Sequence, residues 1–245
     1  IEIGIMGKGG KRGKSTKFSS FQEIELLLSN KKEDCRYAVM MTWPEAGTFE
    51  IPERNQYTVD MIRLAFFKEG CRDALRYAKK MIQKGYEVFL QPMATFMYSR
   101  DELNQMIEQV NAVRPKALYM VDSFSNLYPK DVRIMADCIL KELDRNIDFG
   151  FHAHNNIQMA FANVIEFLDT DTQRDLYVDG SIFGMGRGAG NVPVELLMEF
   201  LNKEGARYDI SRVLYTYQKY IKPIFIQKLH QQLYRHISRS SGPSE

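Results

Sequence analysis

Short apolar stretches of strand length recur along the chain, and polar residues, glycines or prolines separate them. Their length and apolar character are typical of buried β-strands. The intervals between most of them are long enough to hold a helix. On this pattern we predict seven strands, at residues 1–6, 36–41, 61–66, 87–90, 117–121, 148–153 and 176–182.

Segments with apolar residues at helical spacing lie between these strands. In one of them Ser99 is in the N-cap position and Glu102 follows three residues later, which is the capping-box pattern. Proline opens two others, at Pro129 and Pro193, and Gly85 follows another as a C-terminal stop. We predict helices at 21–29, 71–84, 99–113, 129–143, 158–168 and 193–202, and a C-terminal helical extension and tail over 206–245.

Strands that alternate with helices predict parallel strands joined by crossover helices, and therefore an α/β fold. Seven strands are compatible with an open doubly wound sheet, or with a (β/α)8 barrel that has one strand unaccounted for. In a barrel, the loops that follow the strands carry the chemistry, and here these loops are polar or glycine-rich.

The composition narrows the class of protein. Hydrophobic residues make up 44% of the chain and charged residues 26%, which excludes a disordered or fibrous protein. The net charge of +2 does not favour binding to nucleic acid. Three separated cysteines do not suggest a disulfide framework, and no apolar run or signal peptide indicates a membrane or secretion. We therefore expect a soluble, cytoplasmic protein.

Two histidines at the end of one predicted strand form the first candidate site. Successive strand residues point to opposite faces, so His152 and His154 point the same way and could both bind one divalent ion. The pattern alone is equally compatible with a hydrogen-bonded structural pair. The position at a strand end favours the metal site.

A glycine-rich loop over 184–191 follows the last predicted strand. Its alternating glycines allow close approach of the backbone to a ligand, and Asn191 offers an amide oxygen. A structural turn is the alternative. The spacing does not match a dinucleotide-binding fingerprint, so we reject that interpretation.

Two further motifs give weaker evidence for a binding site. Asp122 and Ser123 follow a strand and could bind a carboxylate, although by themselves they are more typical of a turn. The basic loop Lys8–Thr16 resembles a phosphate-binding loop, but its glycine and lysine spacing fits neither the standard nor the deviant pattern. A solvated loop is the favoured interpretation there.

Together these segments resemble the HMG-CoA lyase-like family of metallolyases with a DRE-type TIM barrel, and in particular its metal-dependent aldolase branch, which includes the 4-hydroxy-2-oxovalerate aldolases. The resemblance is carried by segments in the same order and at suitable separations, with the last two the most specific: 1–4, 85–93, 119–124, 150–156 and 184–191.

The resemblance implies a TIM-barrel catalytic domain over 1–205, with one strand missing. It implies that His152 and His154 bind a divalent cation, Mn²⁺ or Mg²⁺ with Zn²⁺ as an alternative, and that Asn191 is a further ligand. Glu2 is implied as a catalytic residue that handles protons or supports the site. Ser123, Gly186 and Gly188 are implied to bind substrate.

One departure from the family concerns its first strand. That strand carries an Arg-Asp pair, in which the Asp binds the metal and the Arg stabilises the enolate, and this chain begins at the strand that follows. We expect an upstream segment rather than a truncated, inactive barrel, because a barrel without one strand has two unpaired edges. In addition, Phe67 stands where some relatives have a polar residue.

The resemblance implies an aldolase that forms or cleaves the C–C bond of a 4-hydroxy-2-oxo acid through a metal-stabilised pyruvate enolate. Its partners would be a 2-oxo acid and an aldehyde, with no nucleic acid or membrane, and a homodimer is the expected assembly. Two alternatives stay open: a Claisen-type acyl-CoA condensing enzyme of the same family, and a non-catalytic or NTP-binding module that uses Lys8–Thr16.

Overall fold

The structure of this protein is a computed structural model that describes residues 1–8 and 16–224. The chain forms two compact units, Ile1–Asp179 and the residues from Gly180 onward. The first unit contains the whole β-sheet. The loop residues 9–15, which form most of the candidate phosphate loop, and the predicted tail lie outside the described residues.

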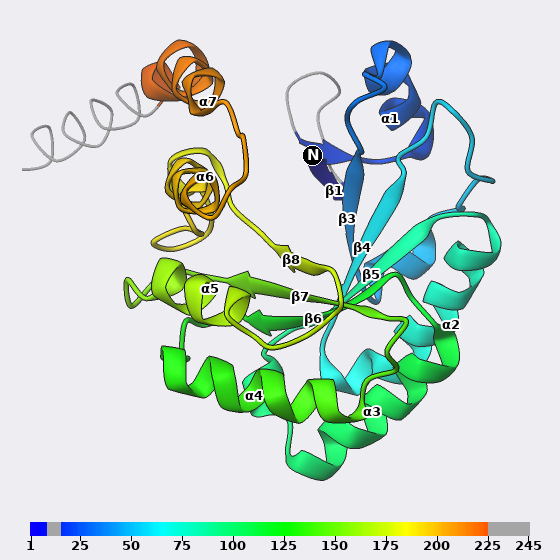
Figure 1. Ribbon diagram of the computed structural model, residues 1–245. Helices are drawn as coiled ribbons and strands as arrows, with labels where there is room; N and C mark the ends of the chain where they lie inside the picture. The colour runs from blue at the N-terminus through cyan, green and yellow to red at the C-terminus, as the bar shows by residue number, and fades with distance from the viewer. Residues whose placement is uncertain (9–15, 225–245) are drawn as a thin grey trace, which may run out of the picture. The chain divides into compact units, whose positions relative to one another are not determined.

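All strands of the sheet run parallel, in the spatial order β2-β1-β3-β4-β5-β6-β7-β8 (Figure 1). The seven predicted strands are confirmed, although the last ends at Val178 and not at residue 182. The two-residue strand β2 was not predicted, because it is too short to show a pattern. The bounds are β1 Glu2–Met6, β2 Lys17–Phe18, β3 Ala38–Thr42, β4 Met61–Phe66, β5 Glu87–Pro92, β6 Ala117–Asp122, β7 Asp148–Ala153 and β8 Leu176–Val178.

The strand order decides between the two architectures left open above. From β3 to β8 each strand lies beside its neighbour in sequence, as in a barrel, whereas a doubly wound sheet reverses its order part-way. The sheet is not closed among the described residues, because β2 and β8 form its two edges. The fold is therefore a partial (β/α)8 barrel.

Helices α2, α3, α4 and α5 lie one after another along one side of the sheet (Figure 1). The capping box of Ser99 and Glu102 at the start of α3 is confirmed, as is the proline in the first turn of α4. The bounds are α1 Phe21–Leu27, α2 Cys71–Gln83, α3 Arg100–Val113, α4 Pro129–Glu142 and α5 Ala160–Leu168, and in the second unit α6 Val194–Lys203 and α7 Ile210–Thr216.

The two faces of the sheet differ in what they bury. On the face covered by helices, the rings of Phe149 and Phe151 in β7 pack on Phe167 of α5, at centroid distances of 5.1 and 5.4 Å. On the opposite face, Phe89 and Tyr119 pack with Val121 in a small apolar cluster. Because side chains alternate along a strand, this second face also carries every other residue of β4 to β7, including the polar ones described below.

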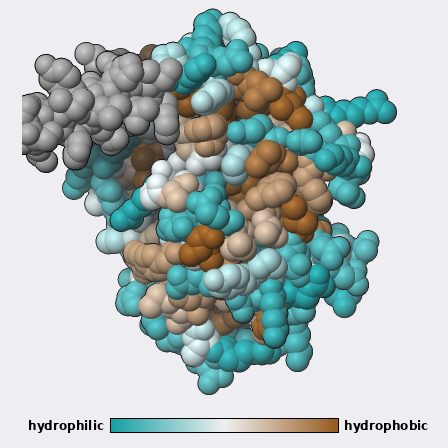
Figure 2. Space-filling model, turned by 90° about the vertical axis from the view of Figure 1, so that its left-hand side faces the viewer, coloured by the Kyte–Doolittle hydropathy of each residue, from teal (hydrophilic) through white to brown (hydrophobic). Residues whose placement is uncertain are grey.

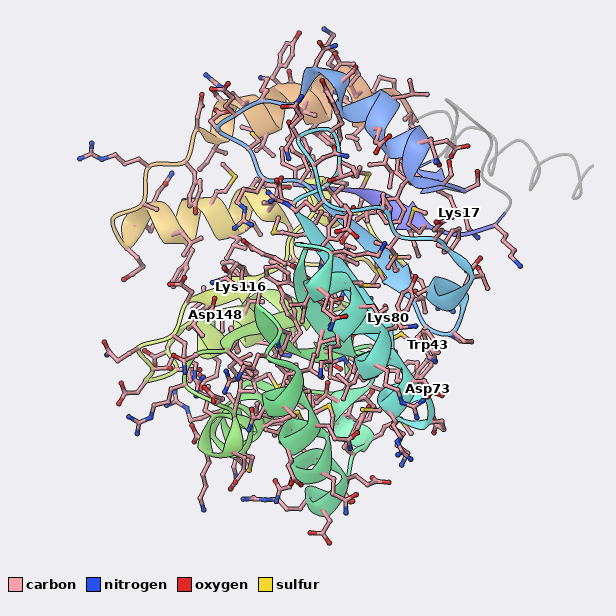
Figure 3. All side chains as sticks on the ribbon, turned by 90° about the vertical axis from the view of Figure 1, so that its right-hand side faces the viewer. Lys17, Trp43, Asp73, Lys80, Lys116 and Asp148 are labelled. Atoms are coloured by element: carbon pink, nitrogen blue, oxygen red, sulfur yellow. The ribbon has the colours of Figure 1, made fainter. Side chains whose placement is uncertain are left out.

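Two sets of ion pairs hold the amino ends of the strands. Lys116, just before β6, and Asp148, the first residue of β7, lie side by side with Nζ and Oδ2 2.5 Å apart (Figure 3). Asp60, just before β4, is buried and binds Lys31 and Arg54 through Oδ1, at 2.6 and 3.1 Å. These contacts lie at the end of the sheet away from His152.

Among residues 1–8 and 16–224, no helix is long and apolar enough to cross a membrane. Apolar residues are exposed on the second unit, among them Leu196, Leu214 and Tyr215. Figure 2 shows apolar and polar residues interspersed over the face that it draws.

Candidate active site

The predicted histidine pair lies at the carboxyl end of β7. Gly150 and His152 are on the face of the sheet away from the helices, and His154 follows one residue after the strand ends. The two imidazole rings are nearly perpendicular, with centroids 4.8 Å apart. The structure therefore brings together the two side chains that strand alternation placed on one face.

Both histidines use the same ring nitrogen to bind the protein. His152 Nδ1 lies 2.7 Å from Oδ2 of Asp179, and His154 Nδ1 lies 2.9 Å from the backbone oxygen of Asp122. Both partners are acceptors, so each Nδ1 must carry the proton in a neutral ring. The lone pair of each ring is then on Nε2, the nitrogen that a cation would bind.

Asp179 belongs to a polar network on this inner face. Arg63 of β4 donates from Nη2 to Asp179 and from Nη1 to Glu2 of β1, the latter at 2.5 Å. The amide of Gln91 in β5 faces the same guanidinium and, with Oε1 toward it, accepts from Nε at 2.6 Å and from Nη2 at 2.5 Å. Glu2, the predicted catalytic residue, is therefore an ion-pair partner of Arg63.

Tyr119 of β6 completes this network. Its hydroxyl lies 3.4 Å from Oδ1 of Asp179. The guanidinium carbon Cζ of Arg63 lies over the Tyr119 ring, 5.5 Å from the ring centroid. Gly150 on the neighbouring strand makes room for the ring: a Cβ at that position would lie 2.3 Å from Cε2 of Tyr119. A glycine in the strand thus allows an aromatic ring to reach the carboxylate.

Burial and charge act against each other in this network. Burial by itself would raise the pKa of Asp179, but Arg63 and His152 outweigh it and lower that pKa below its ordinary value. Burial would lower the pKa of Arg63, but the two carboxylates raise it above its ordinary value. Burial raises the pKa of Tyr119 well above its ordinary value. These shifts favour an ionised Asp179, an ionised Arg63 and a protonated Tyr119.

The predicted substrate residue Ser123 lies at the end of β6, next to the residue whose backbone holds His154. Its Oγ accepts the backbone N–H of Ala94 at 2.8 Å. The carboxylate of Asp122 points elsewhere and accepts the backbone N–H groups of Asn126 and Leu127 at 2.8 and 3.2 Å. Its pKa is raised by burial. Asp122 thus forms the turn that the sequence favoured, while the Ser123 hydroxyl can still donate its own proton.

The glycine-rich loop belongs to the second unit, so it is described by itself. Asn191 donates from Nδ2 to the backbone oxygen of Met185 at 3.2 Å, and its Oδ1 has no hydrogen-bond partner among the described residues. Gly186 packs against that amide, since a Cβ there would lie 2.7 Å from Nδ2. Gly188 has a positive φ of 65°. Asn191 therefore carries an unused acceptor, which suits a ligand.

Sequence reasoning missed four residues of the network: Arg63, Gln91, Tyr119 and Asp179. A signal for two of them was present. Arg63 is a lone charge inside an otherwise apolar strand, and Asp179 lies directly after β8. A charge in such a place is rarely buried without a partner. The partners themselves could not be identified, because they come from other strands.

The two histidines supply part of a metal site. Their nitrogen ligands suit Mn²⁺ and Zn²⁺, and fixed Nδ1 positions are typical of metal-bound histidine. Within the described part of the chain, no group of three or more His, Cys, Asp or Glu side chains lies close enough to hold an ion. The donor set therefore fits a cation that is completed by other ligands.

Comparison with known proteins decides the family. The sequence profile of the HMGL-like family matches residues 23–218, which is most of the chain. This chain belongs to the HMGL-like family. The matched range includes both histidines, Arg63, Asp179 and Asn191.

Curated relatives in this family carry two different names. The chain is 29% identical over 157 residues to an oxaloacetate decarboxylase of Mycobacterium tuberculosis, covering 63% of this chain and 45% of that protein. It is 27% identical over 188 residues to a 4-hydroxy-2-oxovalerate aldolase of Bacillus thuringiensis, covering 76% and 54%. The chain thus spans about half the length of these relatives.

Solved structures of the HMGL-like kind share the fold. The N-terminal domain of a provisionally assigned aldolase from Bacteroides vulgatus superposes with a TM-score of 0.72 at 25% identity, covering 91% of this chain and 75% of that one. The HMG-CoA lyase of Bacillus subtilis gives a TM-score of 0.61 at 12% identity, covering 77% and 70%. The latter likeness concerns the fold alone and supports the partial barrel.

Proposed function

We propose that this HMGL-like protein is a divalent-cation-dependent carbon–carbon lyase, an aldolase that cleaves a 4-hydroxy-2-oxo acid to pyruvate and an aldehyde or catalyses the reverse. One observation carries the proposal: two imidazoles at a strand end have both Nδ1 positions held by acceptors. In this arrangement the lone pair of each neutral ring is on Nε2, the nitrogen through which such a histidine binds a cation. The family and the names of the curated relatives support the reaction class.

The residues of the site take the following roles in this proposal. His152 and His154 hold the cation. The assignment of Asn191 as a metal ligand stays a proposal that rests on the family resemblance of the glycine-rich loop. When bound, the cation acts as a Lewis acid toward the carboxylate and 2-oxo oxygens of the substrate. Ser123 accepts a backbone N–H and so has its hydroxyl proton available for the substrate carboxylate. Gly186 and Gly188 leave room for substrate beside Asn191.

The direct test is to remove the two imidazoles. We expect wild-type protein to bind about one Mn²⁺ per chain in electron paramagnetic resonance titrations, because two neutral imidazoles form a chelate. His152→Ala and His154→Ala should each weaken binding at least about 10-fold, and the double variant should abolish it. Asp73→Asn, an exposed change on α2, is the control. Stoichiometric Mn²⁺ in the folded double variant would overturn the proposal.

A second candidate is decarboxylation of a 2-oxo diacid such as oxaloacetate. The relative at 29% identity carries that name. The candidate has a chemical argument as well, because loss of carbon dioxide needs no base to deprotonate a 4-hydroxyl. Within residues 1–8 and 16–224, the only histidines are the two of the proposed cation site, and the exposed Phe67 follows β4 where some relatives have a polar residue.

Assays for pyruvate with the two substrate classes separate these candidates. Release of pyruvate from 4-hydroxy-2-oxo acids supports the aldolase. Release from oxaloacetate alone, faster than the background rate with free Mn²⁺, supports the decarboxylase. Release from neither, by a protein that binds Mn²⁺, would contradict both activities for this chain.

A further inference from the structure

We propose that Asp179 and Arg63 are positioning residues for His152: Arg63 fixes the Asp179 carboxylate, and Asp179 fixes the ring and the tautomer of His152. The role assigned to His152 rests on the proposed function, in which this imidazole is a cation ligand. The positioning itself rests on the contacts of the polar network on the inner face of the sheet.

The contacts of Arg63 favour a structural role over substrate binding. Its guanidinium has five N–H donors. Four of them go to Glu2, to Asp179 and, in two bonds, to the amide of Gln91 with its Oε1 toward the guanidinium. The side chain is only 13% exposed. An arginine whose donors are used in this way holds protein groups in place and has little capacity left for a substrate carboxylate.

Asp179 is held from three sides. Oδ2 accepts from His152 and from Arg63, and Oδ1 faces the hydroxyl of Tyr119. A carboxylate with three partners has little rotational freedom, so the direction of its bond to His152 Nδ1 is fixed. A fixed acceptor on Nδ1 keeps the proton there and aims Nε2 away from the carboxylate.

The network also connects strands that are distant in the sheet. Glu2 lies on β1, Arg63 on β4, Gln91 on β5, and Asp179 directly after β8. The guanidinium therefore links the beginning, the middle and the end of the sheet across its inner face. The position of the His152 ring depends in this way on several other strands as well as on its own.

His154 provides an internal control, because its Nδ1 partner is the backbone oxygen of Asp122. No side-chain substitution removes that acceptor. Changes at Asp179 or Arg63 should therefore alter the tautomer of His152 and leave the tautomer of His154 unchanged. A general loss of structure would change both tautomers.

The first experiment measures ¹⁵N chemical shifts of the two imidazoles in metal-free protein at about pH 8. We expect wild-type His152 to be protonated on Nδ1, and Asp179→Ala to shift it toward the Nε2-protonated form while His154 keeps its Nδ1 proton. Wild-type His152 protonated on Nε2 would overturn the proposal without any variant.

The second experiment measures Mn²⁺ affinity. We expect Asp179→Asn and Arg63→Lys to weaken Mn²⁺ binding by about 10- to 100-fold, as is usual when the partner of a metal-bound histidine is changed. The control is Asp60→Asn, which removes another buried, ion-paired carboxylate at the far end of the sheet and should leave Mn²⁺ affinity within about 2-fold of wild type.

The outcomes separate the two proposals. If Mn²⁺ binding needs both histidines but survives Asp179→Asn and Arg63→Lys at wild-type affinity, and the His152 tautomer is also unchanged, the positioning proposal is wrong and the proposed function stands. If Mn²⁺ binding does not need the histidines while Asp179→Ala still shifts the His152 tautomer, the proposed function fails and the positioning of the ring stands.

Discussion

Single side chains in this protein take their roles from neighbours on adjacent strands. Tyr119 reaches Asp179 only because the strand beside it has glycine at the paired position, Gly150. His152 presents Nε2 only because Asp179 accepts from Nδ1. At the scale of the residue, the site is therefore a set of matched pairs, each consisting of a functional side chain and the group that makes space for it or fixes it.

Adding one methyl group tests this matching. Gly150→Ala would place a Cβ 2.3 Å from the Tyr119 ring, inside a buried strand. We expect this variant to lose about 1–3 kcal/mol of unfolding free energy, since overpacking of a core has that cost. Urea denaturation measures the change. Gly150→Ala combined with Tyr119→Leu should recover part of the loss, and Gly150→Ala at wild-type stability would contradict the packing described here.

At the scale of the element, local signals mark where helices begin and where strands end. Ser99 Oγ accepts the backbone N–H of Glu102 at 3.3 Å, and the Glu102 carboxylate accepts the backbone N–H of Ser99 at 2.8 Å. Other ends depend on distant residues: Arg174 donates to the backbone oxygens of Leu143 and Ile147 after α4, at 2.7 Å each. The start of α3 is therefore fixed by residues close in the sequence, whereas the segment after α4 is held by a residue distant in the sequence.

The capping box makes a prediction for α3. Ser99→Ala removes the side-chain acceptor for the N–H of Glu102, and we expect a loss of about 1 kcal/mol in unfolding free energy. Ser99→Asp keeps an acceptor and should stay within about 0.5 kcal/mol of wild type. Equal stability of the alanine and aspartate variants in chemical denaturation would show that the cap is not contributing.

For the molecule as a whole, the polar contacts divide between the two ends of the sheet. The carboxyl ends of the strands hold the proposed site, and the amino ends hold ion pairs such as that of Asp60. This carboxylate joins the segment before β3 to the loop before β4, through Lys31, the backbone N–H of Tyr37 and Arg54. Its contribution is to the stability of the unit that contains the sheet.

Asp60 also makes a pH prediction. Burial would raise its pKa, but the bonds from Lys31, the Tyr37 backbone and Arg54 outweigh burial and lower the pKa below the ordinary value of about 3.9. The folded state therefore binds the proton less readily than the unfolded state. The stabilisation is complete above about pH 4 and is lost as the pH falls through the lowered pKa.

We accordingly expect Asp60→Asn to lose about 1–3 kcal/mol of unfolding free energy near neutral pH and progressively less below about pH 4. Denaturation curves of both proteins across this range measure the difference. The control is Asp73→Asn, whose exposed pair with Arg76 should contribute less than about 1 kcal/mol. An Asp60→Asn deficit that is the same at every pH would contradict this assignment.

The sequence by itself determined the elements and the candidate ligands. Strands β4 and β7 lie at the predicted residues, helices α1 to α6 begin within two residues of their predicted starts, and strand alternation placed both histidines on one face. These features depend on neighbours a few positions apart, where side-chain spacing and caps act directly. The prediction failed where an element was too short to show a pattern, as in β2, or ended early, as in β8.

Only the tertiary structure decided the strand order, the partners of the two imidazoles and the role of Arg63. Arg63 and Asp179 are 116 positions apart, and no local pattern connects them. Their contact exists because parallel strands bring distant residues to one face, where burial makes an unpaired charge costly. Sequence indicates which residues can bind a cation. The packing of the sheet decides which ring nitrogen each histidine presents, because hydrogen bonds from other strands fix the proton.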